Sequence, residues 1–201
     1  MFTANILRGP LVAAALALPG LSGAAISPAL SETVRQLAQA QSQDLEAIFQ
    51  QVHANPELAF QLDETAALVA KKLKKMGYKV HTGIAQTGLA AVLKNGEGPV
   101  IMFRSDMDAL PVKEDSGLSY ASKKQVTLDD GSSQYVSHAC GHDAHTAWLL
   151  GIAKVMMETR DSWSGTLVLV GQPAEELIAG AQAMVDDGLS DKGPEPSLLI
   201  S

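Results

Sequence analysis

The sequence AHTAWLLGIAKVMMETRDSWSGTLVLVGQPAEE (residues 144–176) joins a helical pattern to a buried strand. Over residues 144–158, apolar side chains recur at the three- and four-residue spacing of a helix face, and residues 166–170 form the short apolar run of a buried strand. Glu175 and Glu176 follow soon after that run. Because ligands of α/β proteins bind at the carboxyl ends of strands, this stretch indicates both a fold class and a location for chemistry.

Outward from this stretch, helical and strand patterns alternate along the chain. Ser31 is a candidate cap for a first helix that ends at Asn55-Pro56, and Gly77 occupies the cap position after a second one. The turn sequence at 95–98 favours a β-hairpin between two strands. We expect helices over 31–52, 63–76, 144–158 and 179–187, strands over 79–82, 89–93, 100–103, 166–170 and 198–200, and a smaller hairpin at Asp129-Asp130-Gly131. The predicted class is α/β, a mostly parallel mixed sheet sandwiched by helices.

Composition limits the classes of protein that this chain can be. Its 201 residues are 46% hydrophobic and 18% charged, which is typical of a globular domain and excludes a long disordered chain. The net charge of −7 argues against a nucleic-acid partner, which would need a basic face. A single cysteine excludes an internal disulfide.

Residues 1–25 have the pattern of an export signal. Arg8 precedes an apolar run over 11–18, Pro19-Gly20 interrupts it, and small residues suited to signal peptidase follow. The run is shorter than the roughly 20 residues that span a bilayer, so we expect no stable membrane anchor. The prediction is a periplasmic or secreted protein with a mature domain over 26–201; the alternative is a frayed apolar helix.

The densest chemical cluster is His138-Ala139-Cys140-Gly141-His142-Asp143-Ala144-His145. In an extended segment Cys140 and His142 point to the same side, and thiolate and imidazole both bind zinc and similar divalent ions. We expect Asp143 to cap the following helix and to accept a hydrogen bond from a ligand imidazole. His138 is a candidate for supporting this site or for hydrogen-bonding the loop, and His145 for supporting it or for packing on the helix face that His142 begins.

Two acidic pairs follow predicted strands. In an extended segment Glu175 and Glu176 would point to opposite sides, so that one binds a metal and the other acts as the base that hydrolysis requires. Asp106 and Asp108 share a face after the strand over 100–103, from which they can bind a metal or orient the histidines. The alternative for this second pair is a polar strand end in which Arg104 pairs with a carboxylate.

Together these three segments resemble the metal-dependent aminoacylase–hippurate hydrolase family, which includes the plant auxin-conjugate amidohydrolases and is zinc-peptidase-like. The segments 53–58, with Glu64-Thr65, and 87–89 resemble two further motifs of that family, so the similarity covers about residues 49–200. The resemblance implies a two-domain hydrolase with two divalent metal ions, either zinc or manganese, cobalt or nickel. Its expected substrates are N-acyl amino acids or peptide-like amides, cleaved by a metal-activated water.

Residue roles follow from the same resemblance. Cys140, His142 and Glu176 match metal ligands, Glu175 matches the general base, and Asp108 matches the carboxylate that orients a ligand. Asp106 occupies the position of a metal-binding histidine in related metallopeptidases. Family members continue beyond residue 201 with further ligand histidines and a lid and dimerisation domain. We therefore expect a truncated, partial catalytic domain that forms homodimers only where the lid is present.

Two other interpretations stay open at this point. In the first, Cys140 is a nucleophile activated by His142 or His138. In the second, the chain is an inactive fragment or a pseudoenzyme, because part of the ligand set and the lid lie outside it. On the sequence alone we expect the complete protein to hydrolyse amides and this chain by itself to be inactive.

Overall fold

The computed structural model describes residues 26–127 and 130–201, so the expected export signal over 1–25 lies outside the described part. The helices in this part are α1 (Pro28–Ala40), α2 (Ser42–Ala54), α3 (Asp63–Lys75), α4 (His142–Glu158) and α5 (Gly180–Asp186), with short 3-10 turns η1 (Arg160–Ser162) and η2 (Leu189–Asp191). The strands are β1 (Lys79–Ile84), β2 (Gly88–Asn95), β3 (Val100–Asp106), β4 (Gln125–Thr127), β5 (Ser133–Tyr135), β6 (Gly165–Gln172) and β7 (Leu198–Ile200).

The central sheet has five strands in the order β1-β2-β6-β3-β7. Strand β2 is antiparallel to both of its neighbours, β1 and β6, whereas β3 is parallel to β6 and β7. Strands β1, β6, β3 and β7 therefore run in the same direction, and only β2 opposes them. This arrangement confirms the predicted mostly parallel mixed sheet.

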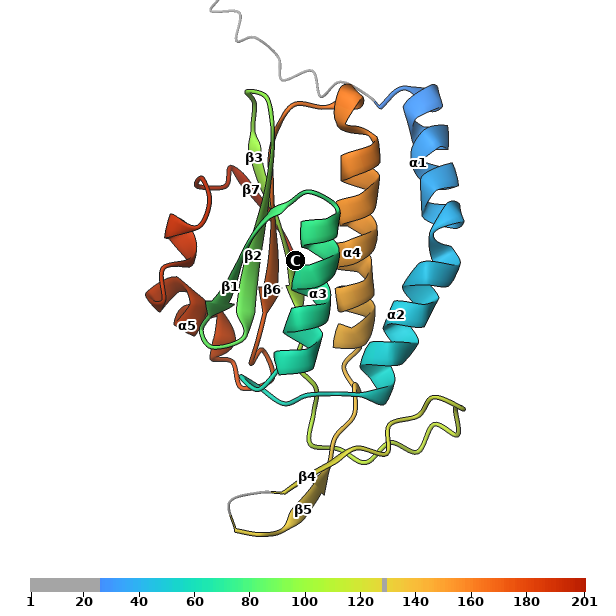
Figure 1. Cartoon of the computed structure of the whole chain (residues 1–201), viewed down its shortest axis with the longest axis vertical. Coiled ribbons are helices and arrows are strands. Elements are labelled where there is room, and N and C mark those ends of the chain that lie inside the picture. The colour runs from blue at the N-terminus through green and yellow to red at the C-terminus, as the bar shows by residue number, and fades with distance from the viewer. Residues whose placement is uncertain (1–25, 128–129) are drawn as a thin grey trace, which may run out of the picture.

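Helices cover both faces of the sheet. Helices α3 and α4 pack on one face with α2 outside them, and α5 lies on the other face (Figure 1). Alternate residues of β2 serve the two cores: Leu89 and Ala91 join the cluster under α3 and α4, whereas Ala90 joins the cluster that contains Met184 of α5. The period of two along each strand thus produces the predicted sandwich.

The predicted hairpin between β2 and β3 is wrong, because β6 lies between these strands. All residues of β6 are buried, and a strand that is apolar on both faces is most stable in the middle of a covered sheet. Gly98 instead takes part in a close backbone contact with residues 164–165. A Cβ on Gly165 would lie 2.3 Å from the Pro99 carbonyl oxygen, and one on Gly98 would lie 3.0 Å from that of Ser164.

The single helix expected over 31–52 is also wrong, since it is divided at Gln41 into α1 and α2. The buried Gln41 amide donates a hydrogen bond of 3.2 Å to the Gly151 carbonyl of α4, which holds the chain at this break. The cap of α1 is Ser27 rather than Ser31: its hydroxyl accepts from the Leu30 N–H at 3.2 Å.

The remaining predictions for elements agree with the structure. Gly77 follows α3 with a φ of +93°, as a left-handed cap residue does. Strands β4 and β5 form the small hairpin, of whose predicted turn Asp130 and Gly131 are described and Asp129 is not. Over residues 26–127 and 130–201, no helix has the length and apolar character needed to cross a membrane.

Candidate metal centre

The site lies where β3 and β6 end and α4 begins. Because β3 and β6 are parallel and in register, Asp106 pairs with Gln172 at their carboxyl ends. The Met107 N–H donates to the Gln172 carbonyl at 3.0 Å, which joins the two following loops. Gly141, with a φ of +86°, turns the chain into α4, whose first residue is His142. The three acidic and histidine segments of the sequence therefore converge here.

His142 is the central residue of the site. It is buried, and its Nδ1 donates to the backbone carbonyl of Asp108 at 2.8 Å. That bond fixes the ring so that Nε2 points at acidic groups. Nε2 lies 3.7 Å from a carboxylate oxygen of Glu175, 4.0 Å from Glu176 and 3.9 Å from Asp106. An imidazole held in this way at Nδ1 is suited to bind a metal through Nε2.

Asp108 fixes the loop that carries both glutamates. The residue is 1% exposed, and its carboxylate accepts hydrogen bonds from the backbone N–H groups of Glu175 and Glu176, each at 3.1 Å. Ala174 before them has a φ of +51°, a strained conformation for alanine that marks a tight turn. The prediction that the two glutamates lie in an extended segment and point apart is therefore wrong: both carboxylates approach His142.

Two donor groups share His142. The Cys140 thiol, a His142 nitrogen and a Glu176 oxygen lie within 4.8 Å of one another, and so do donors from Asp106, His142 and His145. The Oε1 atom of Glu176 is buried with no hydrogen-bond partner, a costly state that a cation would relieve. The first group offers sulfur, nitrogen and oxygen, and the second offers nitrogen and oxygen. Both donor sets fit a divalent transition metal.

The structure confirms the alternative interpretation of this strand end, in which Arg104 pairs with a carboxylate, whereas metal binding by Asp106 stays a prediction. One carboxylate oxygen of Asp106 pairs with the Arg104 guanidinium, which also donates to the Gln172 side chain at 2.6 Å. The other oxygen lies 3.6 Å from Nδ1 of His145. Arg104 therefore holds Asp106 in place while leaving one oxygen directed at the histidines.

The electrostatics of the cluster favour a bound cation and oppose a cysteine nucleophile. Desolvation and the negative charges of Glu176 and Glu175 raise the pKa of the Cys140 thiol, so it stays protonated without a metal. Burial alone would lower the pKa of His142, but its bonds to Asp108 and the charge of Asp106 raise it to about 8. A divalent ion would reverse both effects, since it binds the thiolate and the neutral imidazole.

The structure corrects two expectations about this loop. Asp143 lies inside α4, whose cap position is Gly141, and its carboxylate accepts from Nδ1 of His53 at 2.6 Å rather than from a ligand imidazole. His138 is buried outside both donor groups, and neither ring nitrogen has a hydrogen-bond partner, so the alternative that His138 hydrogen-bonds the loop is wrong. Burial lowers the pKa of His138 to about 4, so this ring is neutral.

Sequence reasoning missed the contribution of residues near the start of the domain. His53 and Glu57 lie in a motif that the family resemblance includes, but their residue types alone assign them no role. The carboxylate of Glu57 accepts from the N–H groups of Glu64 and Thr65 at the start of α3, at 3.1 and 2.8 Å. Glu114, which bonds His53, lies in a polar stretch with no pattern that distinguishes it.

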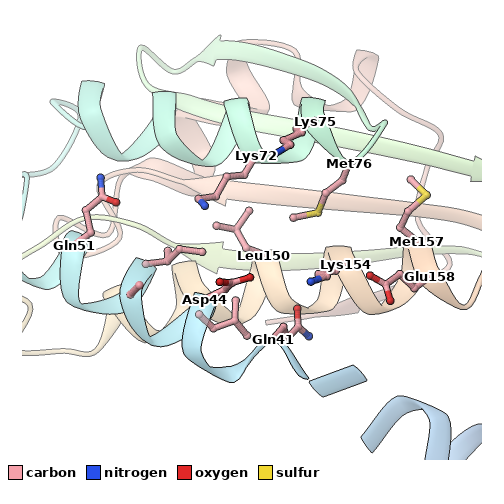
Figure 2. Close-up of a pocket in the computed structure, with 13 residues that line it drawn as sticks. Gln41, Asp44, Gln51, Lys72, Lys75, Met76, Leu150, Lys154, Met157 and Glu158 are labelled. Atoms are coloured by element: carbon pink, nitrogen blue, oxygen red, sulfur yellow. The ribbon is translucent and has the colours of Figure 1, made fainter. Parts of the chain in front are cut away.

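A groove elsewhere on the molecule is separate from this cluster. It has a volume of about 580 Å³ and lies between α2 and α3 over the C-terminal half of α4 (Figure 2). Its lining includes Leu150, Lys72 and Lys154 and none of the proposed donors. The donors sit at the other end of α4, where the strands end.

Comparison with known proteins is consistent with this geometry. The chain is 47% identical over 150 residues to hippurate hydrolase of Campylobacter jejuni, covering 74% of this chain and 36% of that protein. It is 43% identical to N-acetyl-L-cysteine deacetylase of Bacillus subtilis, covering 70% and 32%. A crystal structure described as a dinuclear metal-binding peptidase, also from Bacillus subtilis, superposes with a TM-score of 0.68 at 33% identity, covering 77% and 41%.

The chain spans about a third of the length of these curated relatives. Residues 102–200, which carry every proposed donor, match the peptidase family M20/M25/M40. The matched stretch, the shared fold and the convergent donors agree with one another, and the chain belongs to this family.

Proposed function

We propose that this chain forms the metal-binding part of an amidohydrolase that cleaves N-acyl amino acids or similar small amides with two divalent cations. The observation that carries the proposal is the convergence of donors from Cys140, His142 and Glu176 with those of Asp106 and His145 beside them. The relatives named for hippurate hydrolysis and for N-acetylcysteine deacetylation support the substrate class. Both of those substrates are amino acids with an acylated amino group, so each contains an amide bond.

Each residue of the site has a defined part in this proposal. Cys140, His142 and Glu176 would hold one cation, and Asp106 and His145 beside them would offer an oxygen and a nitrogen to the other. When bound, the cations supply a Lewis acid that polarises the amide carbonyl and makes water acidic. The Glu175 side chain is 39% exposed, against 18% for that of Glu176. This greater exposure suits Glu175 to reach substrate.

Glu175 is the proposed general base. Its carboxylate accepts the proton of the attacking water and returns it to the leaving amine. Asp108 is a positioning residue in this scheme, because its carboxylate holds the backbone of Glu175 and its carbonyl holds the His142 ring.

Several finer assignments belong to the same proposal. The Cys140 thiolate favours zinc in the first group, whereas the oxygen and nitrogen donors of the second also suit manganese, cobalt or nickel. We propose export to the periplasm or medium through residues 1–25, with the partial catalytic domain over 26–201. Dimer formation would require a lid domain. The retained donor set supports a hydrolase over an inactive fragment or pseudoenzyme.

The decisive variant is Glu175→Gln, measured in the full-length gene product with N-acetyl and N-benzoyl amino acids. We expect turnover to fall at least about a hundredfold while metal content is unchanged, because general-base catalysis contributes this much. The matched variant Glu176→Gln should lose metal as well as turnover. Full turnover in Glu175→Gln, or turnover that survives complete removal of metal by a chelator, would contradict the proposal and favour the cysteine nucleophile.

A further inference from the structure

Residues 53–59, which connect α2 to the loop before α3, contact all three segments that carry the metal donors. His53 bonds Asp143, the neighbour of His142. The Glu57 carbonyl accepts from the Ala109 N–H, next to Asp108, at 2.8 Å, and the Ala59 carbonyl accepts from the Ala174 N–H, next to Glu175, at 3.1 Å. Each contact is therefore one residue away from a residue of the proposed site.

This segment is itself firmly held. The Glu57 carboxylate is buried and binds the first turn of α3 through two backbone N–H groups. Leu58 forms an isolated parallel bridge with Ala109, which extends the line of β3 toward the segment. Ala59 has a φ of +50°, a conformation that alanine adopts only where its surroundings impose it. The segment is thus ordered by α3 on one side and by the donor loops on the other.

His53 makes the only side-chain contact from residues 53–59 to the donor loops among the hydrogen bonds of the described residues. Its Nδ1 lies 2.6 Å from the Asp143 carboxylate, and its Nε2 lies 3.0 Å from Glu114. The ring packs against Phe49 and Tyr120, with centroids at 5.6 and 5.2 Å. A ring that is hydrogen-bonded at both nitrogens and packed against two aromatic rings has little freedom, so it fixes Asp143 and hence the start of α4.

We propose that residues 53–59 form a positioning element for the metal centre, with His53 as the positioning residue that holds His142 through Asp143. The inference rests on the proposed function only in requiring that the donors bind metal. His53 touches no donor atom itself. Its effect passes through the first turn of α4, where a small shift would separate His142 from Cys140 and Glu176. Residues that orient a metal ligand without binding the metal themselves contribute about 10- to 100-fold to metal affinity.

The test is a titration of the full-length gene product with Co²⁺, followed by the absorption of the cobalt–thiolate bond of Cys140. His53→Gln places its amide near the Nε2 position and loses the bond to Asp143, whereas His53→Asn places its amide near the Nδ1 position and can keep it. We expect His53→Gln to weaken Co²⁺ binding about tenfold or more, and His53→Asn to restore most of it.

Val52→Ala is the matched control, because Val52 is the adjacent buried residue of α2 and faces the apolar core. It should lower the unfolding temperature while leaving the Co²⁺ affinity within about twofold of wild type. If His53→Gln fails to fold, the same comparison is made with Asp143→Ala, which removes the same bond from the other partner.

The outcomes separate this inference from the proposed function. Unchanged Co²⁺ affinity in His53→Gln or Asp143→Ala, or an equal loss of affinity in Val52→Ala, would overturn the positioning role while leaving the metal centre intact. A wild-type protein that binds no Co²⁺ would overturn the proposed function and the positioning role together.

Discussion

His142 and Asp108 show how single residues define this site. The His142 Nδ1 atom is held by a backbone carbonyl, which leaves Nε2 free to bind one metal ion among the converging donors. One buried carboxylate holds the backbone of two consecutive glutamates. The sequence predicted that Asp108 orients a ligand. It did not show that the carbonyl and the carboxylate of this residue hold different partners, because that depends on the turn at Ala174.

Asp108→Asn tests the role of the carboxylate. An amide has one acceptor oxygen where the carboxylate has two, so one backbone N–H of the glutamate turn loses its partner. We expect a loss of about 1–3 kcal/mol in the free energy of unfolding, together with weaker metal binding. Urea unfolding and zinc titration measure the two effects. Asp161→Asn, at an exposed position, is the control; an Asp108 variant as stable as this control would contradict the assignment.

The protonation of His53 predicts a pH dependence of stability. Burial alone would lower its pKa, but the hydrogen bonds and charges of Glu114 and Asp143 raise it above the ordinary value of 6.5. Its stabilising contribution is therefore complete below about pH 6.5 and is lost as pH rises through the raised pKa.

Urea unfolding at pH 6 and pH 9 measures this contribution. We expect the wild type to lose more unfolding free energy than His53→Gln between these two values. An equal loss in both proteins would show that His53 does not gain a proton on folding.

At the scale of elements, alternation and spacing predicted most of the helices and strands, because each has a strong apolar period. They did not predict pairing. The glycines at 95–98 have the composition of a hairpin turn, yet the contact that requires glycine lies between residues 98–99 and 164–165. Likewise, Glu175-Glu176 follows a strand, but the chain turns at Ala174 because Asp108 binds both N–H groups.

Gly165→Ala tests the close contact beside β6. The new Cβ would lie 2.3 Å from the Pro99 carbonyl at a φ of +121°, so we expect a loss of about 3 kcal/mol or more in unfolding free energy. Gly131→Ala is the matched control, since Gly131 also has a positive φ, +81°, but has nothing within 4 Å of the added Cβ. It should cost about 1–2 kcal/mol. Equal losses in the two variants would contradict the proposed contact.

At the scale of the whole molecule, the sheet presents an apolar edge at β7. Among the described strands β7 pairs only with β3, and Leu198, Leu199 and Ile200 are each about half exposed. A hydrophobic edge strand is a template for pairing with another chain. The other edge, β1, is polar along much of its length.

We therefore expect this 201-residue chain to associate through β7 as its concentration increases. Leu199→Lys should shift sedimentation toward the monomer, because a charged edge residue disfavours pairing. A wild type that stays monomeric at high concentration, or a variant that associates equally, would contradict this prediction.

The most direct test of the central claim is to count the divalent ions bound per full-length protein after dialysis, in wild type and in single variants. The two donor groups predict two ions in wild type, loss of the ion held with Cys140 and Glu176 in His142→Ala, and loss of one ion in Glu176→Gln or in His145→Gln. A wild type without metal, or a His142→Ala variant that keeps both ions, would contradict the account.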